Sequence, residues 1–138
     1  MTAIDASSFE LAHQMFADDI ASRTAGVEIV ELGKGHAIAT MTVTERMVNG
    51  HGITHGGYVF LLADTTFALA CNSHGHPAVG ARADIRYVRP TELGQTLTAI
   101  AKERTRFGRN GIYDVTVMDE QRRVVAEFRG DSRVVPAR

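Results

Sequence analysis

The sequence lacks features that would define several classes of protein. It contains a single cysteine, Cys71, so no disulfide can form within the chain. It also lacks an excess of charge of either sign, because 15 Lys and Arg residues nearly balance 16 Asp and Glu residues and leave a net charge of -1. The single cysteine fits a reducing compartment, and the balanced charge argues against a general nucleic-acid-binding protein.

No apolar run is long enough to cross a membrane, which takes roughly 18 residues, because Asp64 interrupts the longest one. The N-terminus lacks a basic stretch followed by an apolar core, so we expect a cytoplasmic protein that is not bound to a membrane. The 138 residues, 44% hydrophobic and 22% charged, are typical of a globular protein. We find no repeat, linker or low-complexity stretch, and we expect one domain over residues 1–138.

Three common kinds of catalytic site are also unsupported by the sequence. There is no Gly-x-Ser-x-Gly elbow of a serine hydrolase. Histidines occur in close pairs, His51 with His55 and His74 with His76, but no acidic or cysteine ligand lies at a fitting interval. Cys71 lies late in an apolar segment without an obvious base. We therefore predict neither a metal site nor a thiol nucleophile.

The hydrophobic periodicity predicts two helices and about six strands. A short amphipathic helix is expected over residues 8–21, and a helix that is apolar nearly all round over residues 57–73. Segments rich in strand-forming residues, joined by short turns that favour antiparallel pairing, are 27–32, 36–44, 79–88, 96–107, 112–118 and 124–135. This pattern predicts an α+β fold in which a curved antiparallel sheet wraps a long central helix.

The most informative feature is Asp64, the one charged residue in the run from Gly56 to Cys71. A carboxylate in such surroundings is costly to bury unless it has partners or a task, so it is a candidate for a functional site. The run follows a Gly-rich loop, Asn49-Gly-His-Gly-Ile-Thr-His55. We expect the chemistry of the protein at this junction between loop and helix.

The spacing of Asn49, His55, Gly56-Gly57 and Asp64 closely resembles that of the hotdog-fold acyl-CoA thioesterases of the phenylacetate-degradation type. The resemblance covers roughly residues 10–135, because Tyr87-Val-Arg-Pro90, Gly94 and the closing pair of strands also fall where that family has them. It implies hydrolysis of an acyl-CoA, with an aromatic acyl group, to the acid and free coenzyme A. It also implies a homodimer or a dimer of dimers, that is a homotetramer, and no metal or cofactor beyond the coenzyme A of the substrate.

Thioester hydrolysis needs donors for the developing oxyanion and a carboxylate or other base. Gly56 and Gly57 open the central helix, where unpaired N–H groups and the positive end of the helix dipole converge, so they could supply the donors. The alternative is that both glycines only form a tight turn before the helix. The spacing to Asp64 favours the functional interpretation.

One chain cannot bring these two parts of the site together. Eight residues at about 1.5 Å each put Asp64 roughly 12 Å along the helix from Gly56, whereas reacting groups must approach to about 3–3.5 Å. If two central helices lie antiparallel across a two-fold axis, the N-terminus of one approaches the middle of the other. We therefore predict active sites shared between two subunits, with Gly56 of one facing Asp64 of the other.

The roles of individual residues stay open at this point. Asp64 could be a nucleophile that forms a mixed anhydride or a general base that activates water, and the alternative is a structural carboxylate. Asn49 could hold the sulfur or the attacking water through its amide donors, or could be a turn residue in a left-handed conformation. His55 could orient the loop or donate to the substrate carbonyl.

Other residues are candidates for binding the substrate. Some relatives carry a hydroxyl on the strand after the helix that places the water, but Ala81-Arg82-Ala83-Asp84 has none, so Thr65 or Thr66 could take that role. The acyl group is expected to meet Met47, Val48 and Tyr58. The coenzyme A phosphates need basic side chains or backbone N–H groups, for which the candidates are Arg89, Arg106, Gly108, Arg109 and Asn110, although such arginines are often only solvated surface.

Two other functions remain as alternatives. A hotdog dehydratase or hydratase would act on acyl thioesters with the same fold and a histidine with an acidic partner. A non-catalytic acyl-CoA sensor would need an effector region, and the sequence shows neither a helix-turn-helix nor a basic tail. The combination of Asn49, Gly56 and Asp64 favours hydrolysis over both.

Overall fold

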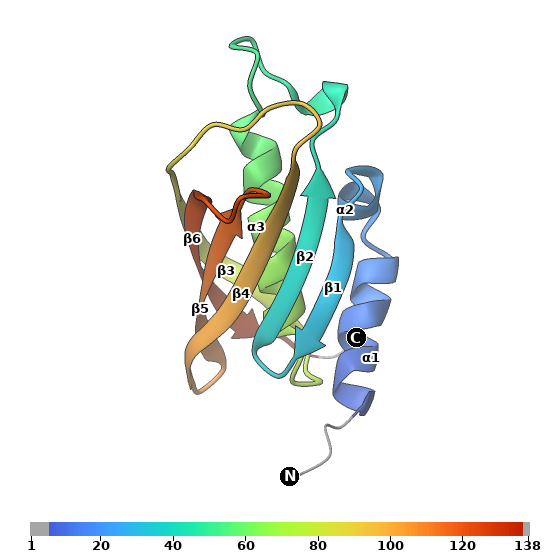
Figure 1. Ribbon diagram of the computed structural model, residues 1–138. Coiled ribbons are helices and arrows are strands. Elements are labelled where there is room, and N and C mark those ends of the chain that lie inside the picture. Colours follow the sequence, from blue (N-terminus) through green and yellow to red (C-terminus); the bar gives the residue numbers. More distant parts are fainter. Residues whose placement is uncertain (1–5, 137–138) are drawn as a thin grey trace.

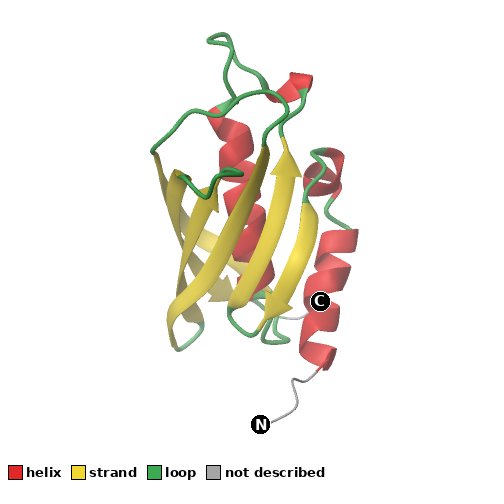
Figure 2. Ribbon diagram, viewed as in Figure 1, coloured by secondary structure: helices red, strands yellow, loops and turns green. Residues whose placement is uncertain are grey.

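A computed structural model describes residues 6–136, in which a curved sheet wraps one long helix (Figure 1). The strands are β1 (Glu28–Gly33), β2 (His36–Thr42), β3 (Ala78–Tyr87), β4 (Thr96–Phe107), β5 (Asn110–Met118) and β6 (Val124–Val134). They form one antiparallel sheet in the order β1-β2-β4-β5-β6-β3. The central helix α3 (Gly56–Cys71) lies in the hollow of this sheet (Figure 2). The predicted α+β architecture is confirmed, with strand ends within about two residues of those expected.

The N-terminal helix predicted over residues 8–21 is instead two helices, α1 (Ala6–Ala17) and α2 (Ile20–Thr24). The break occurs at Asp19, whose carboxylate caps α2 by accepting the backbone N–H of Ser22 at 2.9 Å. An aspartate at this position favours the start of a new helix over the continuation of the old one. Both helices lie on the side of the fold where β1 forms the sheet edge (Figure 1).

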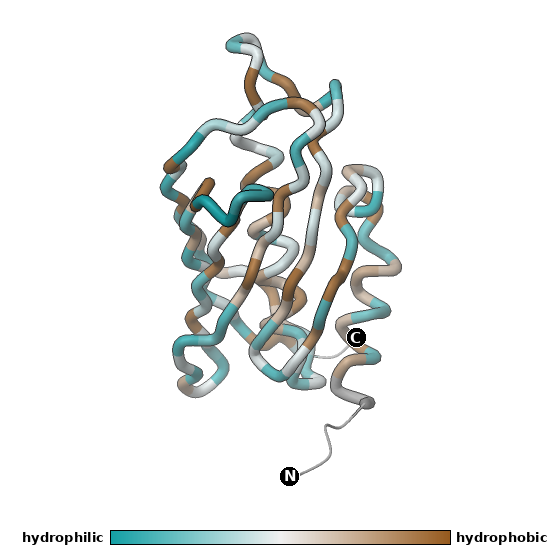
Figure 3. The backbone as a smooth tube through the Cα atoms, in the orientation of Figure 1, coloured by the Kyte–Doolittle hydropathy of each residue, from teal (hydrophilic) through white to brown (hydrophobic). Residues whose placement is uncertain are grey.

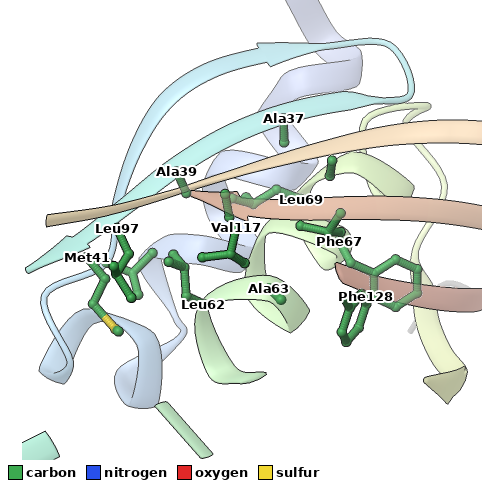
Figure 4. Packing of buried hydrophobic residues seen from close by; sticks show 14 of the residues in the cluster. Ala37, Ala39, Met41, Leu62, Ala63, Phe67, Leu69, Leu97, Val117 and Phe128 are labelled. Atoms are coloured by element: carbon green, nitrogen blue, oxygen red, sulfur yellow. The ribbon is translucent and has the colours of Figure 1, made fainter. Parts of the chain in front are cut away.

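Strand alternation sets how closely the sheet approaches α3. On β5, the inward residues Tyr113, Val115 and Val117 are buried, as the sequence predicted, and Figure 3 shows apolar and polar positions mixed along the strands. On β2 and β4 four of the inward positions are alanine, with Ala37 opposite Ala101 and Ala39 opposite Ala99. Small side chains there leave room for α3, whose Leu62, Phe67 and Leu69 fill the core (Figure 4).

Phe67 packs directly over a glycine of β6. A Cβ atom added to Gly130 would lie 2.8 Å from two carbons of the Phe67 ring, closer than real Cβ atoms come. We expect Gly130→Ala to lower the free energy of unfolding by about 1–3 kcal/mol through overpacking, as measured by denaturant titration. Gly50→Ala is the control, because nothing lies within 4 Å of its added Cβ. An unchanged denaturation midpoint for Gly130→Ala would contradict this packing.

Two neighbouring surfaces are left uncovered in the protomer. Within residues 6–136, strand β3 pairs only with β6, and its residues from Val79 onward are exposed except for the half-buried Ile85. On α3, the residues that escape full burial include a stripe at helical spacing: Gly57, Phe60, Leu61, Asp64 and Ala68. A bare sheet edge beside a largely apolar helix stripe is a surface suited to a second subunit.

Candidate functional site

A cleft of about 430 Å³ opens at the N-terminus of α3. Its walls come from the loop before the helix, the first turns of α3, the end of β3 and the segment that follows β3. Figure 1 shows these segments gathered at one end of the molecule, opposite the β4–β5 hairpin. The lining residues are Asn49, Ile53, Thr54, Gly56, Val59, Tyr87, Val88, Arg89, Pro90, Thr91 and Val125.

Hydrogen bonds between buried threonines hold the two loops of the cleft together. The N–H of Thr54 donates to the carbonyl of Thr91 at 2.9 Å, and the Thr91 hydroxyl donates to the Thr54 hydroxyl at 2.7 Å. The N–H of His55 donates to the carbonyl of Met47 at 2.6 Å. These bonds fix the point at which α3 begins, so the cleft is pre-formed.

Gly56 is placed as an oxyanion donor would be. Its N–H has no hydrogen-bond partner among residues 6–136, as expected for the first residue of a helix. Its carbonyl accepts the Tyr87 hydroxyl at 2.8 Å, and a Cβ at this position would lie 2.9 Å from the tyrosine ring. Only glycine fits here without displacing Tyr87, and the unpaired N–H lies at the cleft.

Gly57 differs from Gly56, because its N–H is already used. The Nδ1 atom of His55 accepts it at 2.9 Å, which makes His55 the N-cap of α3. With Nδ1 acting as the acceptor, a neutral His55 carries its proton on Nε2, and this side chain is exposed. His55 therefore caps the helix start and presents an N–H donor outward without lining the cleft. Gly56 is left as the glycine with an available N–H.

The side-chain oxygen of Asn49 stabilises the loop by accepting backbone hydrogen bonds. Its Oδ1 accepts the N–H of His51 at 2.9 Å and that of Ile53 at 3.3 Å. The residue does not adopt the left-handed conformation considered from the sequence, since Arg122 is the only residue other than glycine with positive φ in the described part of the chain. The Nδ2 group has no protein partner among those residues, so it is available to a ligand in the cleft.

Asp64 is not enclosed within the protomer, contrary to the expectation from its apolar sequence neighbours. Its side chain is exposed on the uncovered stripe of α3, and it does not line the cleft. The helix is apolar on nearly all sides, but only the side that faces the sheet is fully buried, and the stripe with Asp64 is left uncovered. The apolar surroundings still desolvate the carboxylate in part, and together with the nearby charge of Asp19 they raise the pKa of Asp64 above its ordinary value.

The remaining predicted residues fall into three places. Arg89 lines the cleft. Val48 lies beside the cleft, in a single β-bridge with Thr54. Met47 and Tyr58 instead line a separate cavity of about 90 Å³ beneath α2. Four candidates for phosphate binding gather at the β4–β5 hairpin, at the other end of the fold, where they border one small pocket with His74 and His76: Arg106, Gly108, Arg109 and Asn110.

Thr65 is not near the cleft. Its side chain is buried, and its hydroxyl lies 2.7 Å from the hydroxyl of Ser22 in α2. Thr66 is fully buried and donates back to the Leu62 carbonyl at 2.7 Å. Both hydroxyls are thus hydrogen-bonded inside the protomer, and neither lines the cleft.

Sequence reasoning did not assign Tyr87, Thr54 or Thr91 to the site. Tyr87 was part of the matched motif, but its contact with Gly56 spans 31 residues and depends on how β3 passes the start of α3. The signal that could have identified it is the conjunction of a tyrosine at a strand end with a helix that begins on glycine.

Cys71 does not contribute reactivity. It is buried near the end of α3, and burial raises the pKa of its thiol to about 12. We expect its alkylation by iodoacetamide at pH 8 to be very slow in the native protein and fast in denaturant, because the thiolate is the reactive form. Mass spectrometry over time measures both rates, and rapid native modification would contradict this burial.

A curved antiparallel sheet around a helix, with a cleft at the helix N-terminus, defines the class of the protein. A family model described as the thioesterase superfamily matches residues 51–126. The chain therefore belongs to the thioesterase superfamily, with the hotdog fold. None of the helices in the described part of the chain has the length and apolar character needed to cross a membrane.

Individual relatives are similar over most of the chain. The acyl-coenzyme A thioesterase PaaI of Escherichia coli K12 is 43% identical over 91% of this chain and 89% of its own length. The structure of E. coli PaaI, from the phenylacetic acid degradation operon, matches with a TM-score of 0.93 at 40% identity, covering 98% of both chains. The smu.793 protein of Streptococcus mutans UA159, solved bound to acetyl CoA, matches with a TM-score of 0.77 at 31% identity over 81% of this chain and 90% of its own.

Proposed function

We propose that this protein hydrolyses acyl-CoA thioesters to the free acid and coenzyme A, with phenylacetyl-CoA or a related aryl or hydroxyaryl acyl-CoA as its substrate. Membership of the thioesterase superfamily supports the reaction class. The aromatic substrate rests on similarity to PaaI, a relative named as an acyl-coenzyme A thioesterase and encoded in the phenylacetic acid degradation operon. We expect the reaction to take place in the cytoplasm.

The observation that carries the proposal is the available N–H of Gly56 at the cleft, on the N-terminus of a 16-residue helix. A thioester carbonyl placed there gains charge on its oxygen as the carbonyl carbon is attacked, and the N–H and the helix dipole stabilise that charge. The Nδ2 group of Asn49 is available to the sulfur or to the attacking water. The Nε2–H of His55 is a further donor at the same helix end.

Asp64 supplies the carboxylate from the second subunit. As a general base it removes a proton from the attacking water while the C–S bond breaks and the thiolate leaves. As a nucleophile it bonds to the carbonyl carbon while the C–S bond breaks and the thiolate leaves, and water then hydrolyses the mixed anhydride to the free acid and the regenerated carboxylate. A single turnover in H₂¹⁸O that leaves ¹⁸O in the Asp64 carboxylate would establish the anhydride route.

The two uncovered surfaces support one particular arrangement of subunits. Two β3 edges paired across a two-fold axis continue the sheet and bring the stripes of two α3 helices together, with Asp64 in each. The N-terminus of one α3 then approaches the middle of the other. We propose a homodimer with two shared sites, assembled further into a homotetramer.

The same antiparallel arrangement brings the β4–β5 hairpin of one subunit toward the cleft of the other. Arg106 and Arg109 there provide positive charge, and Gly108 and Asn110 provide backbone N–H groups, so we assign the phosphates of coenzyme A to this hairpin. Arg89 lines the cleft itself, closer to the thioester. Val48, Met47 and Tyr58 are assigned to the acyl group.

The test is release of thiol from phenylacetyl-CoA, followed with a thiol reagent, alongside short-chain, long-chain and hydroxyaryl acyl-CoA esters. We expect the aryl esters to have the highest kcat/KM. Hydration of an enoyl-CoA without thiol release would instead indicate the hydratase, and tight binding without turnover would indicate the acyl-CoA sensor. Activity no higher than that of the Asp64→Ala variant would contradict the proposal.

A further inference from the structure

Helix α2 is joined to the catalytic helix by a buried hydrogen bond next to Asp64. The hydroxyl of Ser22 lies 2.7 Å from that of Thr65, the residue that follows Asp64, and the two side chains are 1% and 6% exposed. The contact spans 43 residues of sequence, so it results from folding and not from local structure. A buried polar contact of this kind has a defined geometry, because losing either partner leaves a hydroxyl unsatisfied.

The direction of this hydrogen bond is fixed by Asp19. The Ser22 hydroxyl is 2.6 Å from Oδ2 of Asp19, and a carboxylate can only accept, so Ser22 donates its single proton to Asp19. Ser22 must then accept from Thr65. The result is a one-way chain from the Thr65 hydroxyl through Ser22 to the Asp19 carboxylate, whose other oxygen accepts the Ser22 N–H at 2.9 Å.

This chain of hydrogen bonds holds the exposed stripe of α3 in place at the point where the catalytic carboxylate lies. Thr65 is turned inward by its bond to Ser22, and Asp64, one residue earlier and about 100° around the helix, is thereby turned outward toward the partner. The opposite end of the chain, Asp19, lies close enough to Asp64 that its charge helps to raise the pKa of the Asp64 carboxylate, after the larger effect of desolvation. The hydrogen-bond chain therefore affects Asp64 in two ways. It fixes the neighbouring residue Thr65 on the helix, and the charge of Asp19 acts on the Asp64 carboxylate.

We propose that Ser22, anchored by Asp19, is a positioning residue for catalysis, which sets the rotation of α3 at Asp64 through its hydrogen bond with Thr65. The inference rests on the proposed role of Asp64 as the catalytic carboxylate. It assigns α2 a function in the reaction, although no residue of α2 lines the cleft at Gly56. If the Ser22–Thr65 hydrogen bond only stabilised the fold, its loss would lower the free energy of unfolding and leave the kcat of the folded protein unchanged.

The test compares kcat and KM for phenylacetyl-CoA in Ser22→Ala, Thr65→Val and Thr65→Ser. We expect Ser22→Ala and Thr65→Val each to lower kcat about 10-fold with KM unchanged, since small misplacements of a reacting group reduce rate more than binding. Thr65→Ser keeps the hydroxyl and should retain wild-type kcat. The double variant Ser22→Ala/Thr65→Val should lose no more kcat than either single variant, because both substitutions break the same hydrogen bond.

Thr42→Val is the matched control, since it removes a hydroxyl that lies 2.9 Å from Thr96 on the sheet, and its kcat should stay unchanged. Thermal unfolding of every variant confirms that the protein assayed is folded, and Ser22→Ala carries the test if Thr65→Val does not fold. Full kcat in a folded Ser22→Ala variant, or a loss confined to KM, overturns the inference. A wild-type protein without thioesterase activity, or an Asp64→Asn variant with unchanged kcat, overturns the proposed function instead.

Discussion

Asp64→Asn is expected to lower kcat for phenylacetyl-CoA by at least about 100-fold, with KM little changed. Positioned acid or base groups typically contribute about 10²–10⁴-fold to a reaction rate, and a nucleophile more. Asparagine has nearly the same shape as aspartate, and Asp64 is exposed in the protomer, so the fold and the helix are retained. Steady-state kinetics with a thiol reagent measure the change.

The matched control is Glu28→Gln, which neutralises an exposed carboxylate on β1, away from the cleft. Its kcat should equal that of the wild type. A loss of similar size in both variants would point to a general effect of charge, and full activity in Asp64→Asn would remove the carboxylate from the reaction.

The pH dependence of kcat/KM should reflect the raised pKa of Asp64. Both catalytic roles need the ionised carboxylate, so activity is present above its pKa and is lost as the pH falls through it. Because the pKa lies above the ordinary 3.8, activity should fall at a higher pH than for a fully solvated aspartate. A pH–rate profile measures this, and an acid limb at or below 3.8 would contradict the desolvation inferred for Asp64.

Gly56→Ala is expected to reduce kcat by roughly 10²–10³-fold, the loss typical of removing one oxyanion donor. The N–H remains, but the new Cβ lies 2.9 Å from Tyr87, so the tyrosine or the helix start must shift. Either shift moves the N–H from the position that the oxyanion needs. The effect should appear in kcat for all thioesters that the wild type hydrolyses.

Gly57→Ala provides the comparison for Gly56→Ala. Its Cβ would lie 3.0 Å from Nδ1 of His55, so it is also tight, but its N–H is already occupied by that nitrogen. We expect a smaller loss of kcat at Gly57 than at Gly56. The reverse order would assign the oxyanion to the second glycine.

The sequence was sufficient for the fold because its periodicity reports which faces are buried. The alternation of Tyr113, Val115 and Val117 and the long apolar run of α3 were enough to predict a sheet that wraps a helix. Periodicity could not reveal the break at Asp19, because an aspartate that caps a new helix and one on the surface of a continuous helix give the same sequence pattern. It also could not tell that the apolar run of α3 is buried on one side only, so it did not predict the exposure of Asp64.

The site was predictable only in part, for a related reason. Spacing placed Asn49 and Gly56 at one helix end, and the structure brings them together in one cleft. It could not tell that the N–H of Gly57 is taken by His55, because that bond depends on a side-chain orientation. The inward turn of Thr65 toward Ser22 depends on a contact 43 residues away, which no local pattern encodes.

In the dimer that we propose, each active site combines Gly56 of one subunit with Asp64 of another. Mixing Gly56→Ala and Asp64→Asn subunits under conditions that exchange them tests it directly. In a mixed dimer with shared sites, one site has both residues intact and the other has neither. Random exchange at equal amounts makes about half of the dimers mixed, so we expect recovery of about a quarter of wild-type activity from two inactive parents. Exchange without recovery, with mixed dimers demonstrated by differently tagged subunits, would show that the sites are not shared.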